Sequence, residues 1–210
     1  LTVPHKIIAF DRVQVVDPAA QPVGAVNTLL WEPAGWRGFN TDGYGLATAV
    51  RENLQLGLSG ADILLLGAGG AARGAAVECL QRRCASLWIA NRTAENLESL
   101  RRTLAPLAGG IPVHGFPPSA PPTSLPAGAL VINATSAGLR PSDPLPIALS
   151  SLPLPRAVFD MIYNPPETPL LATARQAGLP HANGLSMLVH QGAKALEIWT
   201  GLPAGQTAPI

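Results

Sequence analysis

Charged residues are scarce in this chain. Only 13% of its 210 residues are Asp, Glu, Lys or Arg, and the formal net charge at pH 7 is +1. A nearly neutral chain with scattered arginines lacks the basic surface that nucleic acids and anionic membranes require of their partners. We therefore expect neither a nucleic acid nor a membrane among its partners.

Cysteines and long apolar runs are also few. The two cysteines, Cys79 and Cys84, have a spacing that matches no zinc or redox motif. No apolar run reaches membrane-spanning length, and no signal peptide is visible at the start of the sequence. These features predict a cytoplasmic protein in a reducing compartment, with buried or idle thiols and no metal site.

Proline and glycine, by contrast, are abundant, with 22 and 21 residues respectively. They follow no periodic repeat and gather in loops, which excludes collagen-like and disordered chains. Hydrophobic residues make up 47% of the sequence. A chain of this length and composition is expected to form one or two globular domains.

A glycine-rich stretch beginning at Gly67 organises the rest of the chain. A strand-length apolar run at 62–66 precedes it, and an alanine-rich stretch with helical spacing follows. The dinucleotide-binding pattern is matched by Gly67, Gly69 and Ala72. In this pattern the glycines allow a tight turn and the close approach of a pyrophosphate, and the small third residue allows the helix to pack against the strand. The first N–H groups of the helix would face the phosphates. The residues predicted to bind the cofactor here are Gly67, Ala68, Gly69, Gly70, Ala71 and Ala72.

The end of the next predicted strand, 86–90, indicates which dinucleotide binds. Asn91, Arg92 and Thr93 stand where an NAD site places an Asp or Glu on the ribose. Arginine instead offers a forked, permanently charged donor that suits a 2′-phosphate. We therefore predict NADP, with NAD the less favoured cofactor; Glu95, close by, is the feature that would favour NAD.

Alternating elements predict an α/β fold. Strands are expected at 62–66, 86–90, around 113–114, at 129–134 and at 157–163, with helices between them. This alternation is typical of a doubly wound parallel sheet, a Rossmann domain. Because ligands bind at the carboxyl ends of such strands, residues 67–72, 91–93 and 133–138 are expected to meet at one edge.

The first part of the chain predicts a smaller α/β lobe. It contains a strand that ends at Pro4, a helix through Val13, a hairpin with strands at 29–31 and 36–39, and a further helix from about 43. We expect a partial substrate-binding lobe at 1–44, a dinucleotide-binding domain at 45–184, and at 185–210 a C-terminal helix that returns to the substrate lobe.

Four polar residues of this region and of the last helix have alternative interpretations. Lys6 lies near a helix start, where a cation is unfavourable, so a function would explain it, although most lysines are simply exposed. Thr41 or Asp42 could merely cap the following helix. Gln191 lies on the apolar helix 185–199, where its amide needs a partner, either protein or ligand.

Segments along nearly the whole chain resemble the shikimate dehydrogenase family. Their order is that of the family, which makes the match far more specific than the glycine turn alone. The matching segments are Thr2–Lys6, Gly24–Thr28, Asn40–Gly43, Gly67–Ala72, Asn91–Thr93, Ile132–Thr135, Asp160–Pro165 with Thr168, and Met187–Ala193.

The resemblance implies reversible reduction of 3-dehydroshikimate to shikimate by NADPH, in aromatic amino-acid biosynthesis. It implies that Lys6 and Asp42 form the catalytic pair. The substrate contacts that it implies are Thr2, Asn27, Thr41, Tyr163 and Gln191. Further cofactor contacts that it implies are Asn133, Ala134, Thr135, Gly184 and Met187.

This chemistry suits the residue types. Hydride transfer to a ketone develops alkoxide charge, which a positioned ammonium such as that of Lys6 can stabilise and protonate. A neighbouring carboxylate would orient the ammonium. Amide and hydroxyl side chains suit a polyhydroxylated ring, since sites built to bind hydroxyl groups reject analogues that lack them.

The sequence also departs from the family pattern. The family's amino-terminal segment, with a Ser-x-Ser motif for the substrate carboxylate, precedes the point where this chain begins, so we expect a fragment that binds cofactor and turns over poorly. Position 96 is Asn where the family often has a second cation. The alternatives are an NAD-dependent quinate dehydrogenase and a non-catalytic NADP-binding relative. A monomer and a homodimer both remain open.

Overall fold

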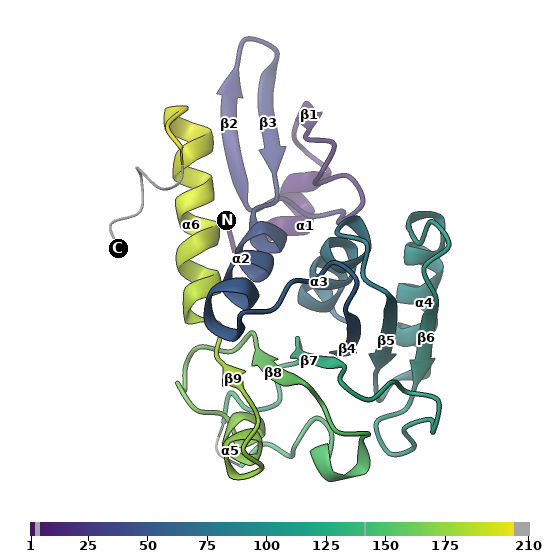
Figure 1. Ribbon diagram of the computed structural model, residues 1–210. Helices are drawn as coiled ribbons and strands as arrows, with labels where there is room; N and C mark the ends of the chain where they lie inside the picture. The colour runs from purple at the N-terminus through teal and green to yellow at the C-terminus, as the bar shows by residue number, and fades with distance from the viewer. Residues whose placement is uncertain (3–4, 141, 204–210) are drawn as a thin grey trace.

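The computed structural model describes residues 1–2, 5–140 and 142–203 (Figure 1). It contains a three-stranded sheet and a six-stranded sheet. Helices α2 (Asp42–Leu54) and α6 (Leu185–Thr200) lie side by side. Helix α2 lies between the two sheets, and α6 continues alongside the smaller sheet.

The larger sheet has the strand order β6-β5-β4-β7-β8-β9, and every neighbouring pair is parallel. The chain runs outward from β4 to one edge and then returns to β7 beside β4, so the topological switch point lies between these two strands. This confirms the predicted doubly wound α/β fold. The strands are β4 (Asp62–Leu66), β5 (Ser86–Ala90), β6 (Val113–Phe116), β7 (Leu130–Asn133), β8 (Ala157–Asp160) and β9 (His181–Ala182).

Strand β4 shows how the sheet is buried on both faces. Ile63 and Leu65 pack in the same cluster as α2, α3 (Gly70–Gln81) and α4 (Ala94–Leu104). Leu64 and Leu66 pack on the other face, in a cluster with α5 (Pro169–Gln176) and apolar loop residues. Burial on both faces explains why the strand reads as an unbroken apolar run. Short 3₁₀ turns lie at Ala105–Leu107 and Leu149–Ser151.

Two sequence expectations about element ends were wrong. Strand β8 ends at Asp160 rather than at 163, because the Asp160 carboxylate accepts the N–H of Ile162 and turns the chain there. The first helix, α1 (His5–Phe10), ends before Val13. The expected proline start of that helix, at Pro4, and most of the expected loop after Gly201 lie outside the described residues.

The smaller sheet has the order β1-β3-β2. Strands β2 (Thr28–Glu32) and β3 (Gly35–Phe39) form the predicted antiparallel hairpin. The two-residue strand β1 (Val15–Val16) pairs in parallel with β3. The hairpin places the chain that leaves β3 directly at the start of α2.

Gly45 allows α2 and α6 to approach closely. A Cβ atom at this position would lie 2.6 Å from the backbone oxygen of Met187 and 3.0 Å from Cβ of Gln191. Since one of these neighbours is backbone, the facing helix would have to shift to admit a side chain.

Alanine at position 45 is therefore expected to lower the free energy of unfolding. Overpacking costs about 1–3 kcal/mol, which outweighs the gain in helix propensity of about 1 kcal/mol. Gly192→Ala is the matched control, because nothing lies within 4 Å of its Cβ, and it should stabilise the protein. Urea unfolding of both variants checks the opposite signs, and a stabilised Gly45→Ala protein would contradict the packing described.

Cys79 and Cys84 are both buried and unpaired. Burial raises the pKa of Cys84 to about 11 and that of Cys79 well above its usual value, so both are protonated thiols at neutral pH. Within the described ranges, no helix is long and apolar enough to cross a membrane. The same residues include no group of three or more His, Cys, Asp or Glu side chains placed to hold a metal ion.

Candidate active site

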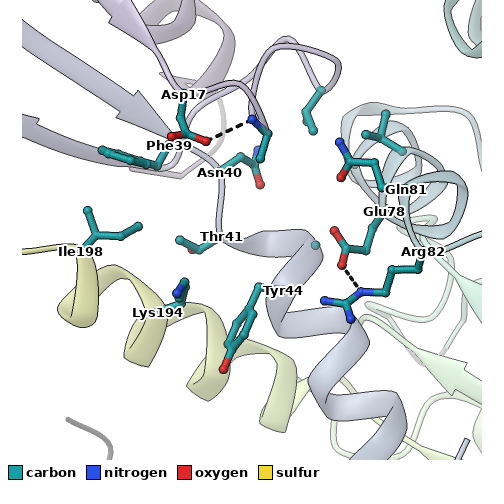
Figure 2. Close-up of a pocket in the computed structure, with 15 residues that line it drawn as sticks. Asp17, Phe39, Asn40, Thr41, Tyr44, Glu78, Gln81, Arg82, Lys194 and Ile198 are labelled. Atoms are coloured by element: carbon teal, nitrogen blue, oxygen red, sulfur yellow. Dashed lines mark hydrogen bonds and ion pairs between the residues drawn. The ribbon is translucent and has the colours of Figure 1, made fainter. Parts of the chain in front are cut away.

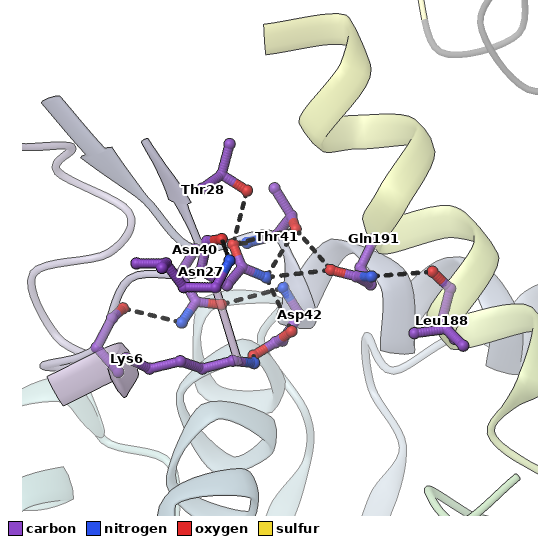
Figure 3. A network of polar contacts seen from close by, with 10 residues as sticks. Lys6, Asn27, Thr28, Asn40, Thr41, Asp42, Leu188 and Gln191 are labelled. Atoms are coloured by element: carbon purple, nitrogen blue, oxygen red, sulfur yellow. Dashed lines mark hydrogen bonds and ion pairs between the residues drawn. The ribbon is translucent and has the colours of Figure 1, made fainter. Parts of the chain in front are cut away.

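Lys6 and Asp42 form an ion pair (Figure 3). Lys6 lies on α1, Asp42 is the first residue of α2, and the distance from Lys6 Nζ to Asp42 Oδ2 is 2.6 Å. Their side chains are 23% and 26% exposed, so the pair is sheltered yet open to a small ligand. The structure thus unites two residues that the sequence separates by 36 positions.

The amide of Asn27 is the centre of the polar network around this pair. It is buried just before β2, and its Nδ2 lies 2.9 Å from Asp42 Oδ1, 2.9 Å from Thr41 Oγ1 and 3.2 Å from Gln191 Oε1. Because an amide carries only two N–H donors, these three oxygens compete for them. The Thr41 hydroxyl, whose oxygen lies 3.4 Å from Gln191 Oε1, supplies the third donor.

Capping does not explain Thr41 or Asp42. Thr41 occupies the N-cap position of α2, but its side chain makes no capping hydrogen bond and instead contacts Asn27 and Gln191. Asn40, which the sequence analysis did not assign to the site, accepts the N–H of Asp42 at 3.0 Å. Asn40 lies beside Thr41 and Asp42 in the segment Asn40–Gly43 that resembles the family, and this position in the sequence could have assigned it to the site.

Gln191 finds protein partners for its amide. Its Nε2 donates to the carbonyl of Leu188 at 3.1 Å, and its Oε1 faces Asn27 and Thr41. The side chain is half-buried. Because its hydrogen bonds fix its orientation, α6 contributes an oriented amide to the cluster that α1 and α2 also form.

The structure does not bring Thr2 or Tyr163 into this network. Thr2 is exposed, and Tyr163, in the turn after β8, is 46% exposed. Neither side chain has a hydrogen-bond partner in the described part of the chain.

The glycine turn lies at the carboxyl end of β4. Gly67 has a φ of +109°, and Gly69 forms the N-cap of α3. A Cβ at Gly69 or Gly70 would meet nothing within 4 Å, so the space before the helix N-terminus is open, while Ala72 is fully buried. Free N–H groups facing open space suit a pyrophosphate.

Asn91, Arg92 and Thr93 follow β5 at the same edge of the sheet. Asn91 Nδ2 donates to the carbonyl of Thr93 at 2.8 Å and closes a turn. Arg92 is exposed and, among residues 1–2, 5–140 and 142–203, has neither a hydrogen-bond nor an ion-pair partner. Its guanidinium is thus free for a phosphate. Glu95 is exposed on the first turn of α4.

The segment after β7 lies against the glycine turn. Asn133 Oδ1 accepts the hydroxyl of Thr135 at 2.7 Å, and a Cβ at Gly67 would lie 3.0 Å from Thr135 Cγ2 and 3.2 Å from the Ala134 oxygen. Residues 133–135 thus line the switch point.

Gly184 and Met187 lie at the other end of the candidate cofactor edge, where α6 begins. Gly184 is the N-cap of this helix, and Met187, in its first turn, is buried. The N–H of Gly184 donates to the carbonyl of Ile162. This hydrogen bond holds the start of α6 close to the turn that follows β8.

A cavity of about 480 Å³ lies between α2, α3, α6 and the end of β3 (Figure 2). Glu78 and Arg82 pair with each other on its α3 wall, and Asp17 and Lys194 add one charge of each sign. Neither Lys6 nor Asp42 lines this cavity. We therefore assign no substrate to it and place the candidate site at the Lys6–Asp42 network.

Comparison with known proteins decides the family. Over 205 residues the chain is 41% identical to the shikimate dehydrogenase (NADP(+)) of Methylobacterium radiotolerans, a match that covers 96% of this chain and 71% of that protein. The chain belongs to the shikimate dehydrogenase family. A family model described as the shikimate 5′-dehydrogenase C-terminal domain matches residues 184–208. The family predicted from the sequence motifs is thereby confirmed.

Solved structures of similar proteins share the fold. Shikimate 5-dehydrogenase of Thermus thermophilus, in complex with NADP(H) and shikimate, matches with a TM-score of 0.80 at 32% identity, over 99% of this chain and 75% of that one. The 5-ketofructose reductase of a Gluconobacter strain matches with a TM-score of 0.84 at 33% identity, over 99% of this chain and 75% of that one. Family members with different named substrates therefore share this architecture.

Proposed function

We propose that this chain is an NADP-dependent shikimate dehydrogenase, an oxidoreductase that acts on a CH–OH group. It interconverts 3-dehydroshikimate and shikimate in aromatic amino-acid biosynthesis. The observation that carries the proposal is the Lys6–Asp42 ion pair, held by Asn27 in a chain of this family.

The catalytic pair divides the work between an ammonium and a carboxylate. NADPH, when bound, supplies the hydride. Lys6 Nζ binds the carbonyl oxygen of the substrate and donates a proton as negative charge develops there, and in the reverse direction accepts the hydroxyl proton. Asp42 orients this ammonium through its Oδ2 atom. The other carboxylate oxygen, Asp42 Oδ1, accepts a hydrogen bond from Asn27 Nδ2. A carboxylate fixed at both oxygens keeps Lys6 pointed at the reacting group.

Substrate binding is assigned to amide and hydroxyl side chains. Asn27, Thr41 and Gln191 already converge and bind the ring hydroxyls, which explains selectivity for a polyhydroxylated substrate. Thr2 and Tyr163, whose side chains are exposed, are assigned to the same substrate pocket because the family resemblance implies it.

Cofactor binding is assigned to the carboxyl edge of the parallel sheet. The open space at Gly69 and Gly70 fits a pyrophosphate, and the free Arg92 guanidinium, with Asn91 and Thr93, fits the 2′-phosphate of NADP. Residues 133–135, Gly184 and Met187 hold the nicotinamide end.

The same proposal extends to the organisation of the chain. Residues 1–44 form part of the substrate lobe, residues 45–184 the dinucleotide-binding domain, and residues 185–210 a C-terminal return to the substrate lobe. The protein acts in the cytoplasm as a monomer or homodimer, without nucleic acid or membrane partners.

An NAD-dependent quinate dehydrogenase is the second candidate, favoured by the exposed carboxylate of Glu95 three residues after Arg92. Initial rates with shikimate or quinate, each with NADP⁺ or NAD⁺, separate the two. We expect shikimate with NADP⁺ to have the highest kcat/KM. Preference for quinate with NAD⁺ would replace the proposal, and NADP⁺ binding without turnover of either substrate would indicate a non-catalytic relative.

A further inference from the structure

A buried carboxylate that takes no part in the Lys6–Asp42 network lies at the end of β8. Asp160 is fully buried, and its Oδ1 accepts hydrogen bonds from Asn133 Nδ2 and from the N–H of Ile162, both at 3.0 Å. Its Oδ2 accepts the hydroxyl of Thr168 at 2.7 Å. Burial raises the pKa of Asp160, and these hydrogen bonds oppose that shift. In the part of the chain that the structure describes, its hydrogen-bond partners are three donors, which suits the ionised form.

The first of these hydrogen bonds leads to the cofactor edge. Because Asn133 turns its N–H₂ towards Asp160, its oxygen must face Thr135, where it accepts both the hydroxyl at 2.7 Å and the backbone N–H at 3.0 Å. Thr135 in turn lies against Gly67 of the glycine turn. The carboxylate of Asp160, together with the Ala137 carbonyl that accepts from the same Nδ2 at 3.3 Å, therefore favours one of the two amide orientations of Asn133 and with it the conformation of residues 133–135.

The second hydrogen bond leads to α6. The N–H of Ile162 donates to Asp160, and the carbonyl of Ile162 accepts the N–H of Gly184 at 3.0 Å. A Cβ at Gly184 would overlap the backbone oxygen of Met161, so the start of α6 is packed directly on this turn. Two turns further along, α6 carries Gln191.

We propose that Asp160 is a positioning residue that joins the cofactor edge at 133–135 to the start of the helix that carries Gln191. It touches neither substrate nor cofactor and acts through Asn133 and Ile162. The inference rests on the proposed function, because it assumes that residues 133–135 contact the nicotinamide and that Gln191 contacts the substrate. Asp160 would fix the positions of these two parts of the site relative to each other.

The third hydrogen bond provides an internal control. Thr168 is the N-cap of α5, and its hydroxyl oxygen accepts the N–H of Leu171 at 3.3 Å. This contact ties Asp160 to α5, which contains neither residues 133–135 nor Gln191. A change at Thr168 therefore perturbs the same carboxylate without breaking either of the two links that carry the proposal.

The test compares Asp160→Ala, Asp160→Asn and Thr168→Val in the full chain. Asparagine keeps an oxygen for Asn133 and Ile162, and its N–H₂ can donate to the Thr168 hydroxyl, whereas alanine removes every acceptor. We expect Asp160→Ala to raise the NADP⁺ dissociation constant and the KM for shikimate by about tenfold or more, since buried donors are left unpaired. Asp160→Asn should restore both to within about threefold of wild type. Thr168→Val should lower only the melting temperature.

The readouts separate this inference from the proposed function. NADP⁺ binding is measured by calorimetry and needs no turnover. A wild-type protein that binds NADP⁺ but does not oxidise shikimate would therefore overturn the proposed dehydrogenase function, while the NADP⁺ dissociation constants of the variants could still be compared. If Asp160→Ala does not fold, Asp160→Ser, with one acceptor, takes its place. The proposal is overturned if the alanine or serine variant binds NADP⁺ like wild type, or if asparagine fails to rescue binding.

Discussion

Replacing Lys6 with alanine is expected to lower kcat for shikimate oxidation by at least about 100-fold, the range in which positioned proton transfer contributes. The NADP⁺ dissociation constant should stay within about twofold of wild type, because Lys6 lies on α1, and α1 is not an element of the cofactor edge. Steady-state kinetics and calorimetry on the same protein measure the two quantities separately.

Lys6→Arg is the matched variant for this prediction. Arginine keeps the positive charge beside Asp42 but remains protonated, so it stabilises an alkoxide without delivering the proton. We expect it to recover only a small part of the lost kcat. A loss of NADP⁺ affinity as large as the loss of turnover in Lys6→Ala would remove Lys6 from the catalytic pair.

Replacing Arg92 with alanine is expected to raise the NADP⁺ dissociation constant by about 10- to 100-fold, as for the loss of charge-assisted hydrogen bonds. The dissociation constant of NAD⁺ should change little, because NAD⁺ has no 2′-phosphate. Arg102→Ala is the control: this exposed arginine on α4 pairs with Glu98 and should leave both constants unchanged. Equal losses for NADP⁺ and NAD⁺ in Arg92→Ala would exclude Arg92 from the 2′-phosphate site.

The larger sheet could be predicted from sequence because its information is local. Strands β4 and β5 begin and end where the apolar runs indicated, and the glycine turn follows β4 as expected. The two-residue strands β1 and β9 carry no such signal, since they exist only through pairing with β3 and β8. The turn at 161–163 was missed because it depends on the side chain of Asp160, and an apolar run does not reveal that contact.

The convergence at the candidate site could not be derived from residue patterns alone. Asn27 and Gln191 are 164 positions apart, and neither spacing nor periodicity places them together. The family resemblance named these residues, and the structure adds their geometry and their competition for one amide. Asn40 and Asp160 were missed because each acts through a neighbour, Asn40 on the N–H of Asp42 and Asp160 on Asn133 and Ile162.

The central claim is that this chain transfers hydride between shikimate and NADP⁺ with Lys6 as the proton carrier. The most direct measurement mixes the purified chain with shikimate and NADP⁺ and follows the absorbance of reduced nicotinamide, beside the Lys6→Ala variant at equal concentration. We predict a signal that requires shikimate and is lost in the variant. No signal from a wild-type chain saturated with NADP⁺, or an equal signal from both proteins, would contradict it.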